Sequence, residues 1–221
     1  MGRISNDDSN YLSQVYDFVD WCEQQYLKLN VKKTKEMIFD FRTRNRVIPE
    51  KIKVDNETVD RVTEYKYLGV VIDEELKGTA NNSLVYKKCK QGLHFLNVLK
   101  SLRVERNILT LFYRSVVESV ICFSITVWFG RLPKKEKNKV NKIIKSAKRS
   151  GAQCETINDL YNRLVIKQTD KIMSDVNHPL HGNYVFLRSG KRLTVPIATR
   201  DRYRDSFVPK SIKIFNHTAS R

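Results

Sequence analysis

The spacing of apolar residues between positions 84 and 129 is the feature that most limits what this chain can fold into. In the first half of this region the apolar residues recur at helical steps: Leu84, Val85, Cys89, Leu93, Leu96, Val98 and Leu99. A second helical stretch covers residues 105–129, and Gly130 with Pro133 is typical of a helix end. Because only residues 102–104 join them, the two helices are predicted to form an antiparallel helical hairpin.

The second stretch is apolar enough over residues 108–129 to raise the question of a membrane span. Arg114 and Glu118 interrupt it, and charged side chains inside a bilayer are costly. We therefore expect a buried core helix and no membrane partner. Residues 1–15 lack the apolar run of a signal peptide, and the four cysteines are isolated, so an intracellular protein is expected, in the nucleus or the cytoplasm.

A helix, a lysine-rich turn and a small sheet are predicted ahead of this hairpin. Apolar residues at three- and four-residue steps indicate a helix up to Tyr26, and residues 28–35 form the turn. Alternation predicts a strand over residues 37–41, and a hairpin turns at residues 55–57. Residues 65–72 are predicted as one further strand, in which Gly69 indicates a bulge or a close backbone approach.

These patterns predict an α+β fold made of four parts. A small antiparallel sheet with one helix covers residues 1–75, and a helical hairpin covers residues 80–130. A basic helical region follows over 131–175, and an irregular basic tail over 176–221.

The net charge of +17 is concentrated near the C-terminus, since residues 131–221 carry +14 of it. Residues 134–149 hold eight Lys/Arg and one Glu around the apolar stripe of Val140, Ile143, Ile144 and Ala147, which predicts an amphipathic helix with a basic outer face. Such a face is either simply solvated or contacts a polyanion, and both interpretations stay open. We expect RNA or DNA as the partner, bound with little sequence preference. The predicted contact residues are Lys32, Lys33, Lys35, Lys134, Lys135, Lys137, Lys139, Lys142, Lys145, Lys148, Arg149, Arg200, Arg202 and Arg204.

No pattern in the chain indicates an active site. Asp7 and Asp8 are adjacent, but polar residues flank them where a two-metal site needs apolar strands, so a solvated loop is expected. His178 and His181 enclose Pro179 and are interpreted as a turn. No phosphate-binding loop or catalytic triad order is present, so we expect no cofactor, no metal and no small-molecule substrate.

The order of these segments resembles the C-terminal part of a reverse transcriptase from non-LTR (LINE-type) retrotransposons. Residues 21–24 and the string LNVKKTK at 29–35 are similar to the helix, turn and strand after the catalytic hairpin of that family. The string YKYLGVVID at 65–73 is similar to its primer grip, which implies a primer-grip role for Tyr67, Leu68 and Gly69. The resemblance further implies that residues 80–130 form a thumb, and that Lys33 and Lys35 match a lysine that assists pyrophosphate departure.

The sequence departs from that family at the catalytic centre. The Tyr-x-Asp-Asp hairpin is expected just upstream of Gly2, and Asp7–Asp8 does not replace it. We therefore expect a non-catalytic remnant without polymerase activity.

A second resemblance concerns residues 27–41, which are similar to a segment named as the N-terminal domain of AlkB-type alkylation-repair homologues that modify tRNA. Oxygenases of that type need a His-x-Asp motif and a distal His for iron, and this chain has no such motif. The alternative function is therefore an accessory region of an AlkB-type methyltransferase or 2-oxoglutarate-dependent oxidoreductase, without the catalytic residues.

Overall fold

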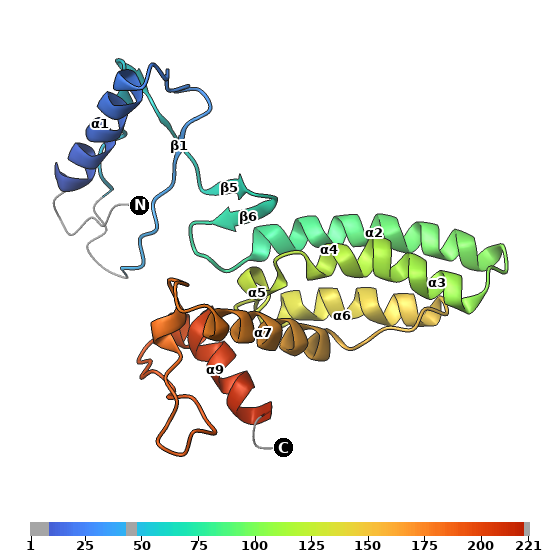
Figure 1. Ribbon diagram of the computed structural model, residues 1–221. Coiled ribbons are helices and arrows are strands. Elements are labelled where there is room, and N and C mark those ends of the chain that lie inside the picture. Colours follow the sequence, from blue (N-terminus) through green and yellow to red (C-terminus); the bar gives the residue numbers. More distant parts are fainter. Residues whose placement is uncertain (1–8, 43–47, 219–221) are drawn as a thin grey trace. The chain divides into compact units, whose positions relative to one another are not determined.

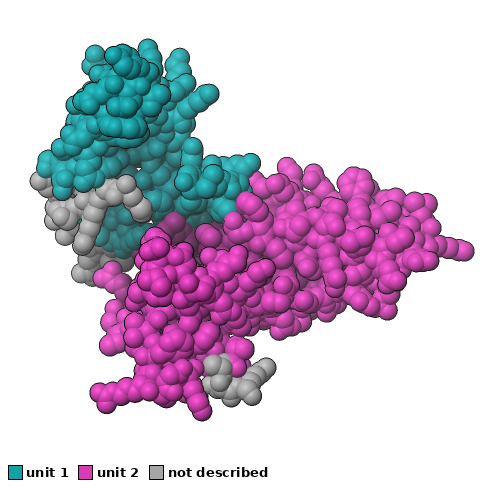
Figure 2. Space-filling view, viewed as in Figure 1, with its two compact units in different colours: residues 1–75 teal, residues 76–221 magenta. Residues whose placement is uncertain are grey.

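The computed structural model describes residues 9–42 and 48–218. The chain divides into two compact units, Met1–Glu75 and Leu76–Arg221, which Figure 2 shows in different colours. The α+β class is confirmed: an N-terminal unit with short strands and one helix is followed by a helical C-terminal unit (Figure 1).

Over residues 9–42 and 48–75, the N-terminal unit combines one helix with three separate two-stranded ladders. Its elements are α1 (Ser9–Gln24), β1 (Lys35–Glu36), β2 (Lys53–Val54), β3 (Glu57–Thr58), β4 (Asp60–Arg61), β5 (Glu64–Tyr67) and β6 (Val70–Asp73). The strands β1 and β4 pair in parallel, whereas β2 with β3 and β5 with β6 are antiparallel. The single antiparallel sheet of the prediction is thus divided, and one of its pairings is parallel.

Two strand predictions in this unit were wrong in detail. The strand expected over residues 37–41 is absent from the described residues, because β1 ends at Glu36 and residues 37–42 lie outside the strands. Residues 65–72 form a hairpin and not one strand, since Leu68 (φ 46°) and Gly69 (φ 89°) make a two-residue turn between β5 and β6. Positive φ at both central residues is typical of a type I′ hairpin turn.

The hairpin at residues 55–57 is confirmed. Asp55 and Asn56 both have positive φ, 51° and 63°, and they join β2 to β3. Asn and Asp tolerate this left-handed conformation better than most residues, which explains why the turn could be predicted from the sequence.

The C-terminal unit is helical. Its elements are α2 (Thr79–Ser101), α3 (Arg106–Phe112), the π-helical segment η1 (Tyr113–Glu118), α4 (Ser119–Cys122), α5 (Ile125–Trp128), α6 (Lys134–Arg149), α7 (Ile157–Ser174), the 3-10 turn η2 (His181–Asn183), α8 (Asp201–Arg204) and α9 (Phe207–Thr218).

The predicted helical hairpin is present, with α2 packed against the helical run that begins at α3 (Figure 1). A Cβ on Gly92 of α2 would lie 2.8 Å from Val117 Cγ2, so this glycine permits the close approach of the two arms. Tyr113 and Val117 of η1 are fully buried in the same core as Leu96.

The second arm is not one continuous helix to residue 129. Phe123 (φ −58°, ψ 112°) and Ser124 (φ 50°) leave the helical conformation, so α4 ends and α5 begins after them. Among the described residues, no helix is both long and apolar enough to cross a membrane.

The tail is more ordered than predicted. The helix α9 packs on α7, and Ile212 lies in a small core with Ile172 and Leu193. The side-chain amide of Asn216 bonds both the N–H and the C=O of Leu193, at 2.7 and 2.9 Å. The expectation of an irregular tail was wrong for residues 207–218, where Val208, Ile212 and Phe215 follow helical spacing.

Candidate nucleic-acid interface

The basic outer face of α6 is the most strongly charged surface that the prediction singled out. Its exposed cations are Lys134, Lys135, Lys142, Lys145, Lys148 and Arg149. At 3.6 residues per turn they share an arc of about 140° and extend over about 22 Å. The one acidic residue of the helix, Glu136, falls outside this arc. The opposite side buries Val140, Ile143, Ile144 and Ala147.

Both ends of α6 are held by α2, so the orientation of this face within the unit is fixed. At the start of α6, Asn82 Nδ2 donates to Glu136 Oε2 at 2.8 Å. At its end, Lys100 Nζ donates to the backbone oxygen of Arg149 at 2.8 Å. Hydrogen bonds from Lys139 and Asn82 lower the pKa of Glu136, with the Lys139 bond the larger cause.

Two predicted contact residues on α6 already have partners. Lys139 Nζ lies 2.7 Å from Glu136 Oε1. Lys137 is half-buried, donates to the backbone oxygen of Gly130 at 3.2 Å and lies over the Phe129 ring at 5.4 Å. The ammonium groups of these two lysines are therefore less accessible than those of the six exposed cations.

Lys137 connects the α6 face to a second group of cations that the sequence prediction missed. Lys210 on α9 donates to the same Gly130 oxygen at 2.6 Å, so the two ammonium groups are neighbours. Burial lowers the pKa of both lysines, and the charge of Lys137 lowers that of Lys210 further. A Cβ on Gly130 would meet Tyr161 Oη at 2.7 Å, which explains why a glycine occupies this position.

A pocket of about 410 Å³ lies next to this pair, between α7, α8 and α9. It is lined by Arg204, Lys210, Lys213 and His217, with Asp205 as its one acidic residue. The signal for these positions was the helical spacing of Lys210, Lys213 and His217, which became informative only once residues 207–218 were known to be helical.

The lysine-rich turn is held by Asn30, whose side-chain oxygen accepts the backbone N–H of Lys33 at 3.0 Å. Lys32 and Lys33 are exposed. Lys35 instead pairs with Asp60 at 2.7 Å across the parallel ladder. The turn belongs to the N-terminal unit and is therefore a separate candidate from the α6 face.

The predicted arginines of the tail lie at and within α8. Arg200 is exposed and precedes the helix, and Arg202 is also exposed. Arg204 pairs with Asp201 at 2.7 Å.

The three residues with a predicted primer-grip role form the tip of the β5–β6 hairpin. Tyr67 and Leu68 are 57% and 79% exposed, so apolar surface is presented at this turn. An exposed hairpin tip of this kind can insert into a groove of a partner, and the primer-grip role stays a prediction.

The other residues considered as metal ligands do not form a metal site among the described residues. Asp7 and Asp8 lie outside the described residues. His178 and His181 occur in a turn, where His178 Nδ1 accepts the Leu180 N–H at 3.1 Å. No group of three or more potential metal ligands occurs in the described part of the chain.

One family model matches the chain, and it describes the N-terminal region of alkylated DNA repair protein alkB homolog 8. The match covers residues 78–119, about a fifth of the chain, which correspond to α2, α3 and η1. This supports the AlkB-type resemblance in part, although the matched segment is the helical hairpin and not residues 27–41. Neither a curated protein nor a solved structure matches the chain.

Proposed function

We propose that the C-terminal unit is a non-catalytic module that binds RNA or DNA with little sequence preference. The six exposed cations on one face of α6 carry this proposal. Lysine and arginine contacts to phosphates supply affinity without reading bases, so a one-sided basic helix is suited to sequence-tolerant binding.

The first test is the salt dependence of binding by the full chain to a labelled DNA duplex and to a single strand of equal length. If all six cations contact phosphates, log K should fall with log salt concentration with a slope of about −5 on the duplex. Weak binding that changes little with salt would contradict the proposal.

The second test locates the interface. A triple variant, Lys142→Gln, Lys145→Gln and Arg149→Gln, should reduce the magnitude of the salt slope by about 3, because each lost phosphate contact removes about one unit. The matched control replaces Lys51, Lys53 and Lys66, all exposed in the N-terminal unit, by Gln and removes the same charge. Equal losses in the two triples would show that total charge matters and the α6 face does not.

The family match favours a second candidate function, an accessory region of an AlkB-type alkylation-repair or tRNA-modifying protein. In this case the helices α2 and α3 would be the shared element, and tRNA would be the preferred polyanion. Competition between tRNA and a DNA duplex of equal charge separates the candidates. Calorimetric titration with ferrous iron and 2-oxoglutarate is expected to give no binding heat, and a saturable heat would assign catalytic chemistry to the chain.

We further propose that the chain descends from a reverse transcriptase, on the basis of the LNVKKTK and YKYLGVVID strings. Primer extension by the full chain with magnesium is expected to give no product. Extension that continues after removal of trace polymerases would contradict the non-catalytic proposal.

A further inference from the structure

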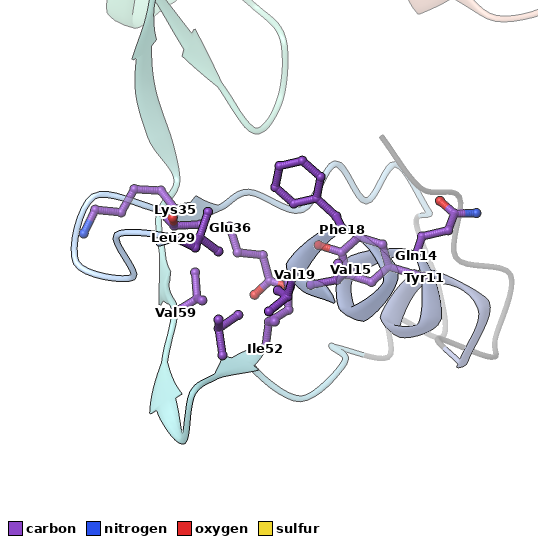
Figure 3. Close-up of a pocket in the computed structure, with 12 residues that line it drawn as sticks. Tyr11, Gln14, Val15, Phe18, Val19, Leu29, Lys35, Glu36, Ile52 and Val59 are labelled. Carbon is purple, nitrogen blue, oxygen red and sulfur yellow. The ribbon is translucent and has the colours of Figure 1, made fainter. Parts of the chain in front are cut away.

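The N-terminal unit contains a pocket of about 370 Å³ between α1 and the strands (Figure 3). Its walls are largely apolar, with Val15 and Val19 contributed by α1 and Ile52 and Val59 by the strand region. This volume falls within the range of about 300–1,000 Å³ that is typical of small-molecule sites.

One carboxylate is buried at this pocket. Glu36 is 5% exposed, and its Oε2 accepts a hydrogen bond from Arg61 Nε at 2.7 Å. Its Oε1 has no hydrogen-bond partner among the described residues. Figure 3 shows the carboxylate directed from β1 toward Val19 and Ile52. A buried carboxylate oxygen without a donor is unfavourable, so a ligand that supplies a donor gains affinity here.

Apart from the Arg61 Nε bond to Oε2, the cationic groups around Glu36 have other partners. The other two nitrogens of Arg61 donate to the backbone oxygens of Pro49 and Glu50, both at 2.9 Å. Lys35 lines the pocket, but its ammonium group binds Asp60 and lies away from the carboxylate.

Tyr11 of α1 also lines the pocket. Its hydroxyl is directed into the space toward Glu36 (Figure 3). Burial raises the pKa of Tyr11, and the charge of Glu36 raises it further against a smaller opposing effect of Arg61. The buried carboxylate of Glu36 disfavours a second anion beside it in the pocket.

We propose that this pocket binds a small amine with an apolar body. The ammonium group donates to Glu36 Oε1, and the apolar body packs between Val15, Val19 and Ile52. Both an ammonium and an alcohol can donate to the carboxylate, but only the ammonium adds the attraction between opposite charges, which selects an amine over an alcohol of the same shape. The site is independent of the α6 face and of the proposed nucleic-acid binding.

The ligand test uses the full chain and three probes that share a phenyl ring: 2-phenylethylamine, 2-phenylethanol and 3-phenylpropionate. Saturable shifts in NMR spectra are expected for the amine, about tenfold weaker binding for the alcohol and none for the carboxylate. Equal binding of all three probes, or no saturation by the amine, would overturn the proposal.

Two variants on α1 test the location. Val15→Phe fills the pocket and is expected to abolish amine binding. Ser13→Phe adds an aromatic ring at an exposed position of the same helix and should leave the affinity unchanged. The proposal fails if Val15→Phe binds the amine as the unaltered chain does, or if Ser13→Phe loses binding to the same degree.

Glu36→Gln tests the carboxylate itself. In a variant whose circular dichroism matches that of the unaltered chain, amine affinity should fall by about tenfold while the affinity for 2-phenylethanol changes little. An unchanged preference for the amine would overturn the assignment of Glu36. If the variant loses its fold, the three-probe series and the Val15→Phe and Ser13→Phe pair decide the question.

Discussion

The two units of the chain are stabilised in different ways. In the C-terminal unit, a continuous cluster of buried apolar side chains runs from α2 through η1 and α6 to α7. In the N-terminal unit, the described apolar cluster is smaller: Val31, Ile52, Val54 and Val59 are buried, and partly buried residues, most of them on α1, cover them. Short ladders and a buried ion pair supply much of the remaining order. We infer that polar interactions matter more, residue for residue, in the N-terminal unit.

The largest expected effect is in the N-terminal unit, at the ion pair of Arg61 and Glu36. Arg61→Ala leaves the carboxylate of Glu36 buried without its charge partner, which costs about 3–5 kcal/mol of unfolding free energy. A unit with so small a core should unfold, whereas the C-terminal unit keeps its structure. Hydrogen exchange read by mass spectrometry separates the two units, with loss of protection expected in residues 9–73.

A double variant, Glu36→Met with Arg61→Met, is the matched control. Because it removes both charges and keeps side-chain volume, it should recover most of the protection that Arg61→Ala loses. Failure to recover would show that the bonds from Arg61 to Pro49 and Glu50 are the more important ones.

A smaller effect relative to its unit is expected for Leu96→Ala. This side chain is 0% exposed in the C-terminal core, and truncation should cost about 2–5 kcal/mol. The larger core should tolerate the loss, so the unit stays folded with a lower denaturation midpoint in guanidinium chloride. Leu102→Ala, at a position 69% exposed, should shift the midpoint little. Equal shifts would contradict the assignment of the core.

The same difference explains how much of the fold the sequence could predict. The helix α6 was predicted at its observed bounds, and α2 over most of its length, because many apolar residues repeat at one period. The β5–β6 hairpin was not predicted, because its two-residue turn depends on the backbone conformation of Leu68 and Gly69. The break at Ser124 likewise has no signal in the apolar pattern, since the residues on both sides continue it.

The candidate site was predictable only in part, and for a similar reason. The spacing of the α6 lysines predicted a basic face, and that face is exposed. Spacing did not predict that Lys137 turns toward the Gly130 carbonyl, or that Lys210, 80 residues away from Gly130 in the sequence, donates to the same oxygen. The unpaired oxygen of Glu36 also lacked a signal, since no pattern in the sequence singled out this residue.

The smallest expected difference is in how often the two units open locally. The alkylation rates of one buried cysteine in each unit measure it. Cys22 in the N-terminal unit and Cys89 in the C-terminal unit are 5% and 1% exposed. Burial raises the pKa of Cys89 to about 12, so at pH 8 its thiol is protonated and alkylation requires opening. Because a thin core opens more often, Cys22 should be modified by iodoacetamide before Cys89, as measured by mass spectrometry of peptides.

The stability of the C-terminal unit should depend on pH through Cys89. The raised pKa of Cys89 means that the folded unit keeps the proton that an unfolded thiol releases above its ordinary pKa of about 9. Stability from this group is therefore complete below about pH 9 and is lost as the pH rises toward 12, so alkylation of Cys89 should accelerate in this window. In urea both cysteines should react together, which controls for intrinsic reactivity. Alkylation of Cys89 as early as Cys22 at pH 8 would mean that the two units open together, and the contrast between a thin and a thick core would not govern their motion.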